Sequence, residues 1–179
     1  MADEIQDVLS NLLDAQMALR KRLASDPSSV LEQEEDYTRT YVLFFGAQIP
    51  YADLSRETEE TKQRLFDKAK EILEGAIDLY DFLSEHFPMK SDARLQALVI
   101  VTELCGFFAL LKFQDEEKNI DVLEELARKV TISRAHKDNG HIRGALEVLE
   151  IEIGCRKNPS QIRPRATAPI AAKRRLPSG

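Results

Sequence analysis

LQALVIVTELCGFFALLKF, residues 95–113, is the stretch that decides the fold. Only four of its nineteen side chains are clearly polar, namely Gln96, Thr102, Glu103 and Lys112. Ser91 or Asp92 can cap the start of a helix here, so we expect a helix over about 92–114. A helix that is apolar on nearly all sides forms the buried centre of a bundle. The stretch therefore predicts an all-α bundle around one central apolar helix.

The same stretch is nearly long enough to cross a bilayer, which takes about 20 apolar residues. Glu103 argues against a membrane span, because a charge near the middle of a bilayer costs at least about 2.5 kcal/mol. Two interpretations of this residue stay open. It is either a carboxyl in apolar surroundings with a raised pKa, available as an acid or base, or a residue at the bundle edge that reaches water or a cation. Gly106 and Ala109, one turn apart, suggest a close approach of a neighbouring helix.

The composition favours one globular domain followed by a charged tail. At 179 residues the chain can bury a sizeable core. Its net charge is −6, but residues 156–179 carry seven Lys or Arg and no acid, which leaves 18 basic and 31 acidic residues over 1–155. We therefore predict an acidic helical domain over 1–155 and a basic tail over 156–179. Four Pro and few large apolar side chains predict that this tail is disordered.

Apolar residues at helical spacing predict the other helices of the bundle. The expected ranges are 3–24, 30–45, 56–87, about 116 or 119 to 130, and about 142–153. Two alternatives stay open. Residues 37–45 are aromatic and β-branched, so a strand is an alternative there, and residues 130–133 could pair with 141–143 in a hairpin around an Asn-Gly turn. The bundle is expected to contain five to six helices.

Two surfaces of these helices are candidate binding sites. The helix over 56–87 carries five carboxylates at helical spacing, here named the acidic strip: Glu71, Glu74, Asp78, Asp81 and Glu85. Such carboxylates repel one another unless they are solvated or paired, so the strip is either a solvated face or a docking site for a basic partner, including this chain's own tail. An aromatic cluster is either core or a stacking platform; it consists of Tyr37, Tyr41, Phe44, Phe45 and Tyr51.

The tail is the third candidate binding surface. Its candidate partner-binding residues are Arg163, Arg165, Lys173, Arg174 and Arg175. Such cations can contact phosphates in a salt-dependent, sequence-independent way. Lys173 to Arg175 also resemble a short nuclear-import signal. The acidic body opposes nucleic acid, so only the tail would engage it.

Motifs that carry chemistry are scarce. The sequence contains no glycine-rich phosphate loop, no nucleophile elbow and no paired Cys-x-x-Cys. The segment RAHKDNGH, residues 134–141, holds His136, Asp138 and His141. A structural zinc site normally has four ligands, usually including Cys. We therefore expect neither a metal nor a cofactor.

One further pair in this segment is the best enzymatic candidate in the chain. Arg134 and His141, with six residues between them, resemble the Arg-x4-6-His pattern of HEPN-domain ribonucleases, which are also all-helical. The resemblance implies a ribonuclease in which this pair is catalytic. Ala135 departs from the family pattern, which usually has a polar residue directly after the Arg. We expect that the protein is not an enzyme.

The predicted compartment and function follow from these features. Cys105 and Cys155 give no disulfide framework, and the acidic N-terminus is no signal or transit peptide, so we expect an intracellular protein, cytoplasmic or nuclear. The leading hypothesis is a non-enzymatic adaptor or assembly subunit that binds protein partners through helical faces and the basic tail, with no membrane contact. Homo-oligomerisation stays open. The alternative is a nucleic-acid-associated protein, cellular or viral, that uses the tail on phosphates.

Overall fold

A computed structural model describes residues 2–26, 30–49, 52–86 and 92–159, except for the side chains of 30–33. Within these ranges it contains seven helices and no strand, which confirms the all-α bundle. The helices are α1 (Ala2–Ser25), α2 (Val30–Gly46), α3 (Glu59–His86), α4 (Asp92–Leu110), α5 (Ile120–Ile132), α6 (Arg134–Asp138) and α7 (Gly140–Lys157). The short α6 is the helix that periodicity did not predict.

Both β alternatives are wrong, and α6 explains one of them. Ser133 ends α5 and caps α6, because its hydroxyl accepts the N–H of His136 at 3.3 Å. Asn139 then caps α7 by accepting the N–H of His141 at 2.8 Å. The Asn-Gly pair thus starts a helix, since an Asn side chain satisfies a backbone donor at an N-cap. Likewise α2 continues without a break through 37–45.

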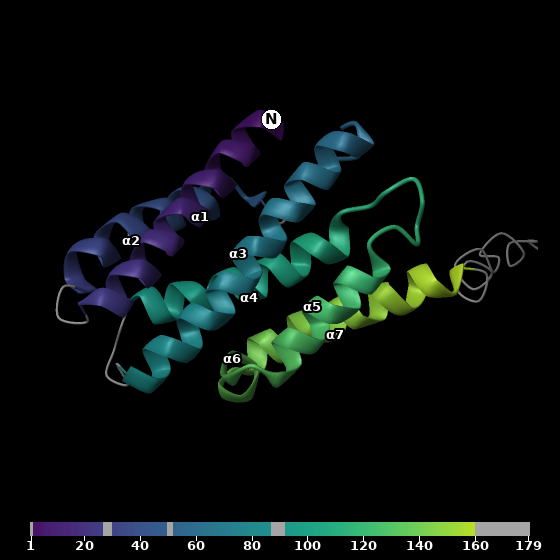
Figure 1. Cartoon of the computed structure of the whole chain (residues 1–179). Coiled ribbons are helices and arrows are strands. Elements are labelled where there is room, and N and C mark those ends of the chain that lie inside the picture. The colour runs from purple at the N-terminus through teal and green to yellow at the C-terminus, as the bar shows by residue number, and fades with distance from the viewer. Residues whose placement is uncertain (1, 27–29, 50–51, 87–91, 160–179) are drawn as a thin grey trace, which may run out of the picture.

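The antiparallel centre of the bundle is formed by α3 and α4 (Figure 1). The helix α4 packs against α2, α3 and α7, whereas α3 packs against α1, α4, α5 and α6. In Figure 1 the α1–α2 pair lies on one side of this centre and α5, α6 and α7 lie on the other. The expected central apolar helix is therefore confirmed, although it shares the centre with α3.

Aromatic rings join α3 to α4 in the core. The ring of Phe66 on α3 meets Phe108 on α4 edge to face, with centroids 5.1 Å apart, and Phe113 at 6.0 Å. Phe107 meets Phe108 in the same geometry at 5.7 Å. Such contacts add to the free energy gained by burial.

By length and composition, α4 is the one described helix that could span a membrane, and 56% of that stretch is buried inside the bundle. Burial of more than half of this stretch is typical of a core helix in a bundle. The remainder of α4 faces outward, and that outward side is described below.

The close approach between helices lies at Gly75, not at Gly106. A Cβ atom on Gly75 would stand 2.1 Å from Nε2 of Gln16 on α1, an atom that donates to the backbone oxygen of Ile72 at 3.2 Å. A Cβ atom on Gly106 would meet nothing within 4 Å. The close approach expected at Gly106 is therefore wrong, and α4 turns this glycine toward open space.

Candidate functional site

The acidic strip lies on one face of α3, and most of its carboxylates bind other helices of the same chain. Asp78 accepts from Arg20 of α1 at 3.2 Å, and Glu74 pairs with Lys129 of α5 at 3.1 Å. Asp81 accepts the first backbone N–H of α6 at 3.2 Å. Three of the five charges therefore stabilise the contacts of α3 with its neighbours.

The two ends of the strip, Glu71 and Glu85, are exposed. Two inner carboxylates, Asp81 and Glu74, are partly buried instead. Burial raises the pKa of Asp81, with the nearby N–H and guanidinium of Arg134 opposing it. Burial acts in the same direction on Glu74, but its hydrogen bonds to Lys129 and Lys70 outweigh it and lower the pKa of Glu74. Glu71 and Glu85 are therefore left for a basic partner, and Asp78, whose side chain is 60% exposed, is accessible as well.

The tail cations from Arg163 to Arg175 lie outside the described residues, but residues 156–159 of the predicted tail do not. Arg156 and Lys157 belong to the last turn of α7, so this helix continues two residues past the predicted start of the tail. Lys157 is exposed and pairs with Glu124 of α5. Arg156 is 5% exposed, and its Nη2 donates to three backbone oxygens at 3.1 Å each, those of Phe108, Ala109 and Leu111.

Arg156 thus closes the C-terminal end of α4. The last carbonyl groups of a helix have no partner within it, and here a buried guanidinium supplies one. Its Nε also donates to Glu152 at 3.1 Å, one turn earlier on α7. A charged group on α7 therefore fixes how α7 docks on α4.

Glu152 makes the fold sensitive to acid. Burial raises its pKa, but its hydrogen bonds to Lys112 and Arg156 outweigh burial and lower the pKa below the ordinary value of 4.5. Because the pKa of Glu152 is lower in the folded protein than in the unfolded chain, its ionised form stabilises the fold. This stabilisation is complete above the pKa of the unfolded chain and is lost as the pH falls through the pKa of the folded protein.

We expect Glu152→Gln to reduce the slope of unfolding free energy against pH below about 4.5. Urea titrations between pH 7 and pH 3 measure this slope; parallel curves for the two proteins would contradict the expectation.

The ribonuclease candidates lie at the starts of two helices. Arg134 is the first residue of α6 and His141 the second residue of α7, and both side chains are exposed. The backbone N–H of each is bound, to Asp81 and to Asn139 respectively. In the part of the chain that the structure describes, no group of three or more His, Cys, Asp or Glu is placed to hold a metal ion.

The aromatic cluster is divided between the core and the surface. Tyr37 and Phe44 are fully buried, so core packing is correct for these two. Phe45 is 57% exposed and stacks on the half-buried Tyr41, with ring centroids 6.4 Å apart. Tyr51 lies outside the described residues. The exposed ring belongs to a larger apolar surface.

That surface is centred on the outward side of α4. Residues at spacings of three and four share one face of a helix, and here they are Leu95, Val99, Thr102, Gly106 and Leu110. The two ends of this stripe, Leu95 and Leu110, are 58% and 57% exposed, whereas the three residues between them are half-buried. The most apolar of the described helices therefore leaves one side exposed at both ends and partly exposed between them.

On one side the stripe is bordered by α2. Glu34 accepts the N–H of Ala93 at 2.9 Å, and Thr38 accepts from Gln96 at 2.9 Å, so α2 runs alongside α4 in the same direction. Phe45 lies seven residues after Thr38, on the same side of α2. Together with Val42, which is 60% exposed, Phe45 extends the apolar stripe onto α2.

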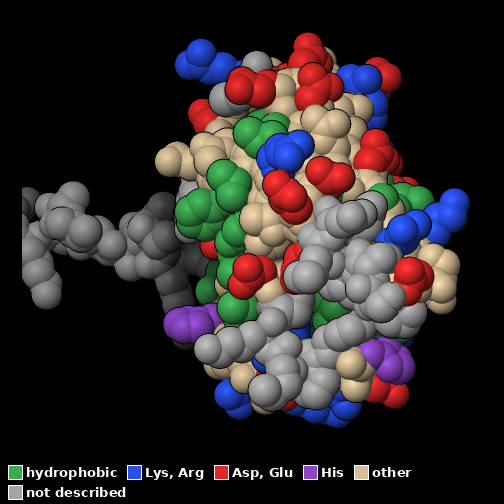
Figure 2. Space-filling view, turned by 90° about the vertical axis from the view of Figure 1, so that its left-hand side faces the viewer, with side chains coloured by type: hydrophobic (Ala, Val, Ile, Leu, Met, Phe, Trp, Pro, Cys, Tyr) green, Lys and Arg blue, Asp and Glu red, His purple; other side chains and the backbone are tan. Residues whose placement is uncertain are grey.

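The other side is bordered by α7. Glu152 and Arg156 face α4 and its connection to α5, and Val148 precedes Glu152 by about one turn. Val148 and Ile151 are 56% and 60% exposed. We name the combined surface the α4 face; it consists of Val42, Phe45, Leu95, Val99, Thr102, Gly106, Leu110, Val148 and Ile151. Figure 2, viewed from the α1–α2 end, shows hydrophobic side chains gathered along one edge of the molecule.

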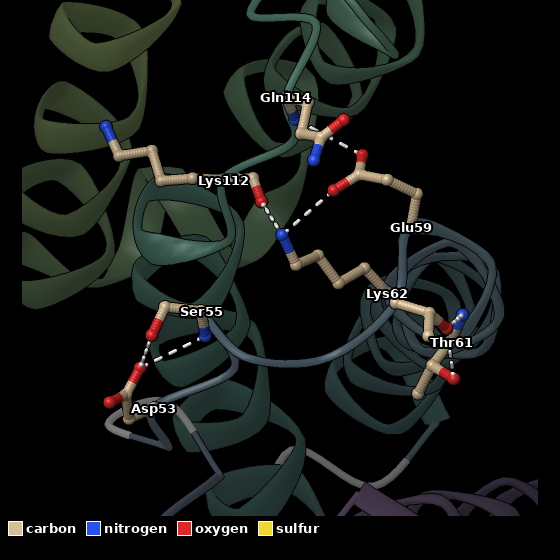
Figure 3. Close-up of polar contacts among 8 residues, drawn as sticks. Asp53, Ser55, Glu59, Thr61, Lys62, Lys112 and Gln114 are labelled. Carbon is tan, nitrogen blue, oxygen red and sulfur yellow. Dashed lines mark hydrogen bonds and ion pairs between the residues drawn. The ribbon is translucent and has the colours of Figure 1, made fainter.

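A cleft of about 400 Å³ lies at one end of the α4 face, where Leu110 forms part of its lining. Its polar groups bind one another (Figure 3). Lys62, 6% exposed, donates to Glu59 at 3.0 Å and to the backbone oxygen of Lys112 at 2.9 Å. Glu59 in turn accepts the N–H of Gln114 at 3.2 Å, and its hydrogen bond with Lys62 lowers its pKa.

These contacts fasten the connection after α4 to the first turn of α3. On the opposite wall, Asp53 accepts both the N–H and the hydroxyl of Ser55, at 3.0 and 2.6 Å, which shapes the loop before α3. The rest of the lining is mostly apolar: Ala52, Leu54, Phe107, Leu110, Leu111 and Phe113. The cleft therefore prolongs the apolar surface beyond the end of α4.

The α4 face was missed in the sequence because the whole helix is apolar. One signal was available: Thr102, Glu103 and Gly106, the least apolar positions of its central turns, lie within one turn of one another on the same side. A scan against protein-family models, a search of curated proteins and a search of solved structures each find no match to this chain.

Proposed function

We propose that the protein is a non-enzymatic interaction protein, an adaptor or assembly subunit, that binds a protein partner on the α4 face. The observation that carries this proposal is where the exposed apolar side chains lie. Nine large hydrophobic residues are exposed among the described residues, and six of them belong to the α4 face. Scattered exposed apolar residues are ordinary, but a contiguous group marks an interaction site.

The size of the face fits reversible binding. Burying six side chains that are each a little over half exposed contributes roughly 5–10 kcal/mol of favourable free energy. The loss of translational and rotational freedom offsets part of this. The α4 face alone would therefore give a weak, reversible contact, which further contacts from the cleft at its end would strengthen.

The acidic strip and the tail have a smaller part in this proposal than in the sequence hypothesis. The three inner carboxylates of the strip are bound within the chain, so a partner would contact mainly Glu71, Glu85 and the exposed side of Asp78. The tail cations add salt-dependent contacts, to protein or, in the alternative function, to nucleic acid. The proposed location stays intracellular, in the cytoplasm or the nucleus.

A matched pair of glycine substitutions tests the proposal. A Cβ atom at either Gly106 or Gly154 meets nothing within 4 Å, and both residues lie inside helices, so Leu at either position should be accommodated. Gly106→Leu places bulk on the α4 face, whereas Gly154→Leu places it elsewhere on α7. We expect the first substitution to reduce capture of a defined set of protein partners from cell lysate at least about tenfold and the second to leave capture unchanged.

Quantitative mass spectrometry of the captured proteins, with and without nuclease, is the measurement. Equal capture by both variants would contradict binding on the α4 face. Capture that is lost only after nuclease treatment would favour the nucleic-acid alternative instead.

A further inference from the structure

A charged residue, Glu103, lies beside the stripe of the α4 face, and among the described residues it has no cationic partner. Glu103 is half-buried on α4, beside the stripe and next to Tyr41 of α2, whose pKa is raised by burial and by the Glu103 carboxylate. Among the described residues, no hydrogen bond or ion pair joins Glu103 to another side chain. A half-buried acid therefore lies at the border of an apolar surface with no ion pair to another described residue.

From this we propose that the α4 face binds an amphipathic helix of a partner protein that carries a Lys or Arg in the middle of its apolar side, opposite Glu103. This inference rests on the proposed function, because it names the kind of partner that the α4 face takes. Covering the face removes Glu103 from water, and an unpaired buried carboxylate opposes binding strongly. A basic side chain in the partner removes that penalty, whereas an apolar or acidic one leaves it.

The dimensions of the face suit one helix. The stripe from Leu95 to Leu110 is about 22 Å long at a rise of about 1.5 Å per residue. A partner helix of about 15 residues has the same length, and its apolar side, repeating at three and four residues, can follow the stripe.

A second copy of this chain fits poorly. Glu103 lies near the middle of the stripe between Leu95 and Leu110. A two-fold dimer centred on the stripe would bring the two Glu103 carboxylates together in an apolar interface, and like charges placed side by side oppose association.

The chain's own tail also fits poorly, although it is basic. Pro164, Pro169 and Pro177 interrupt residues 160–179, and no stretch between them exceeds seven residues. Proline stops a helix, so the tail cannot supply four continuous turns. The partner helix is therefore expected from another protein.

Synthetic helices test this inference without knowledge of the natural partner. Three peptides of about 15 residues share a Leu and Ala apolar side and a Gln polar side, and differ only in a central apolar-side residue, which is Lys, Gln or Glu. Fluorescence anisotropy with the full-length protein gives their affinities. We expect the Lys peptide to bind at least about tenfold more tightly than the Glu peptide.

Variants of the protein test whether the peptide preference comes from Glu103. Glu103→Lys is expected to reverse the order of the peptides, and Glu103→Gln to remove the preference; the second change suffices if the first variant fails to fold. Gly106→Leu should weaken binding of all peptides and Gly154→Leu of none. A preference that persists in Glu103→Gln would overturn the inference. So would a dimer seen in sedimentation that Gly106→Leu abolishes, or tighter peptide binding after Lys173, Arg174 and Arg175 are all changed to Gln.

The two proposals fail in different ways. Peptides that bind in a Gly106-dependent manner but without any charge preference would leave the proposed function in place and remove only the basic partner helix. Peptide binding that is insensitive to Gly106→Leu, together with unchanged capture from lysate, would remove both.

Discussion

Replacing Arg156 by Ala is expected to lower the free energy of unfolding by about 3–5 kcal/mol, the range found when one partner of a buried charged network is removed. The guanidinium donates to three backbone oxygens at the end of α4 and to Glu152. After the substitution these oxygens lie in a buried site without a donor, and each unsatisfied buried group costs about 1–3 kcal/mol. Glu152 keeps only Lys112 as a cation.

Lys157→Ala is the matched control, because the two residues are adjacent in α7 and have the same charge. Lys157 is exposed and pairs with Glu124 on the surface. Exposed ion pairs contribute at most about 1 kcal/mol, so this variant should unfold close to the wild type in urea. Equal effects of the two substitutions would show that Arg156 does not close α4. A deletion of the tail should therefore begin at residue 160, because a deletion that begins at 156 also removes the hydrogen bonds of Arg156 to the end of α4.

Phe44→Ala is expected to destabilise the fold by about 3–5 kcal/mol, whereas Phe45→Ala should change stability by less than about 1 kcal/mol. Phe44 is fully buried, and its removal leaves a cavity that packed helices fill only in part. Phe45 is 57% exposed and loses mainly its stacking on Tyr41. Urea denaturation of both variants measures this difference.

For peptide binding, the residue that matters is expected to be Phe45, although Phe44 is the one that matters for stability. Phe45→Ala should weaken the synthetic helices by removing part of the α4 face, and circular dichroism should confirm that it stays folded. If Phe45→Ala were instead as destabilising as Phe44→Ala, its ring would belong to the core and α2 would not border the α4 face.

Much of the fold could be predicted because helical periodicity is a local property. The apolar spacing in α1, α3 and α5 gave their ranges to within a few residues, and the apolar run at 95–113 gave the central helix. The errors occurred where a side chain acts through a capping contact. Ser133 and Asn139 each begin a helix in a segment whose residue types are equally suited to a turn.

The candidate site was harder to predict, because exposure depends on neighbouring helices. The acidic strip is visible in the sequence, but its pairing with α1, α5 and α6 is not. In α4 every side has nearly the same polarity, so no pattern says which side stays uncovered. Gly75 and Gly106 look alike in sequence, yet one meets Gln16 and the other meets open space.

The sequence by itself determined that this chain forms an all-α bundle, where most of its helices lie, and that one apolar helix belongs to the centre, since these follow from spacing and hydropathy along the chain. Only the tertiary structure decided that Arg156 belongs to the fold, that Phe44 is core while Phe45 is surface, and that Glu103 lies beside an uncovered apolar stripe. The physical reason is that burial and pairing depend on which helices pack together in three dimensions. Adjacent residues with the same chemistry can then face opposite environments.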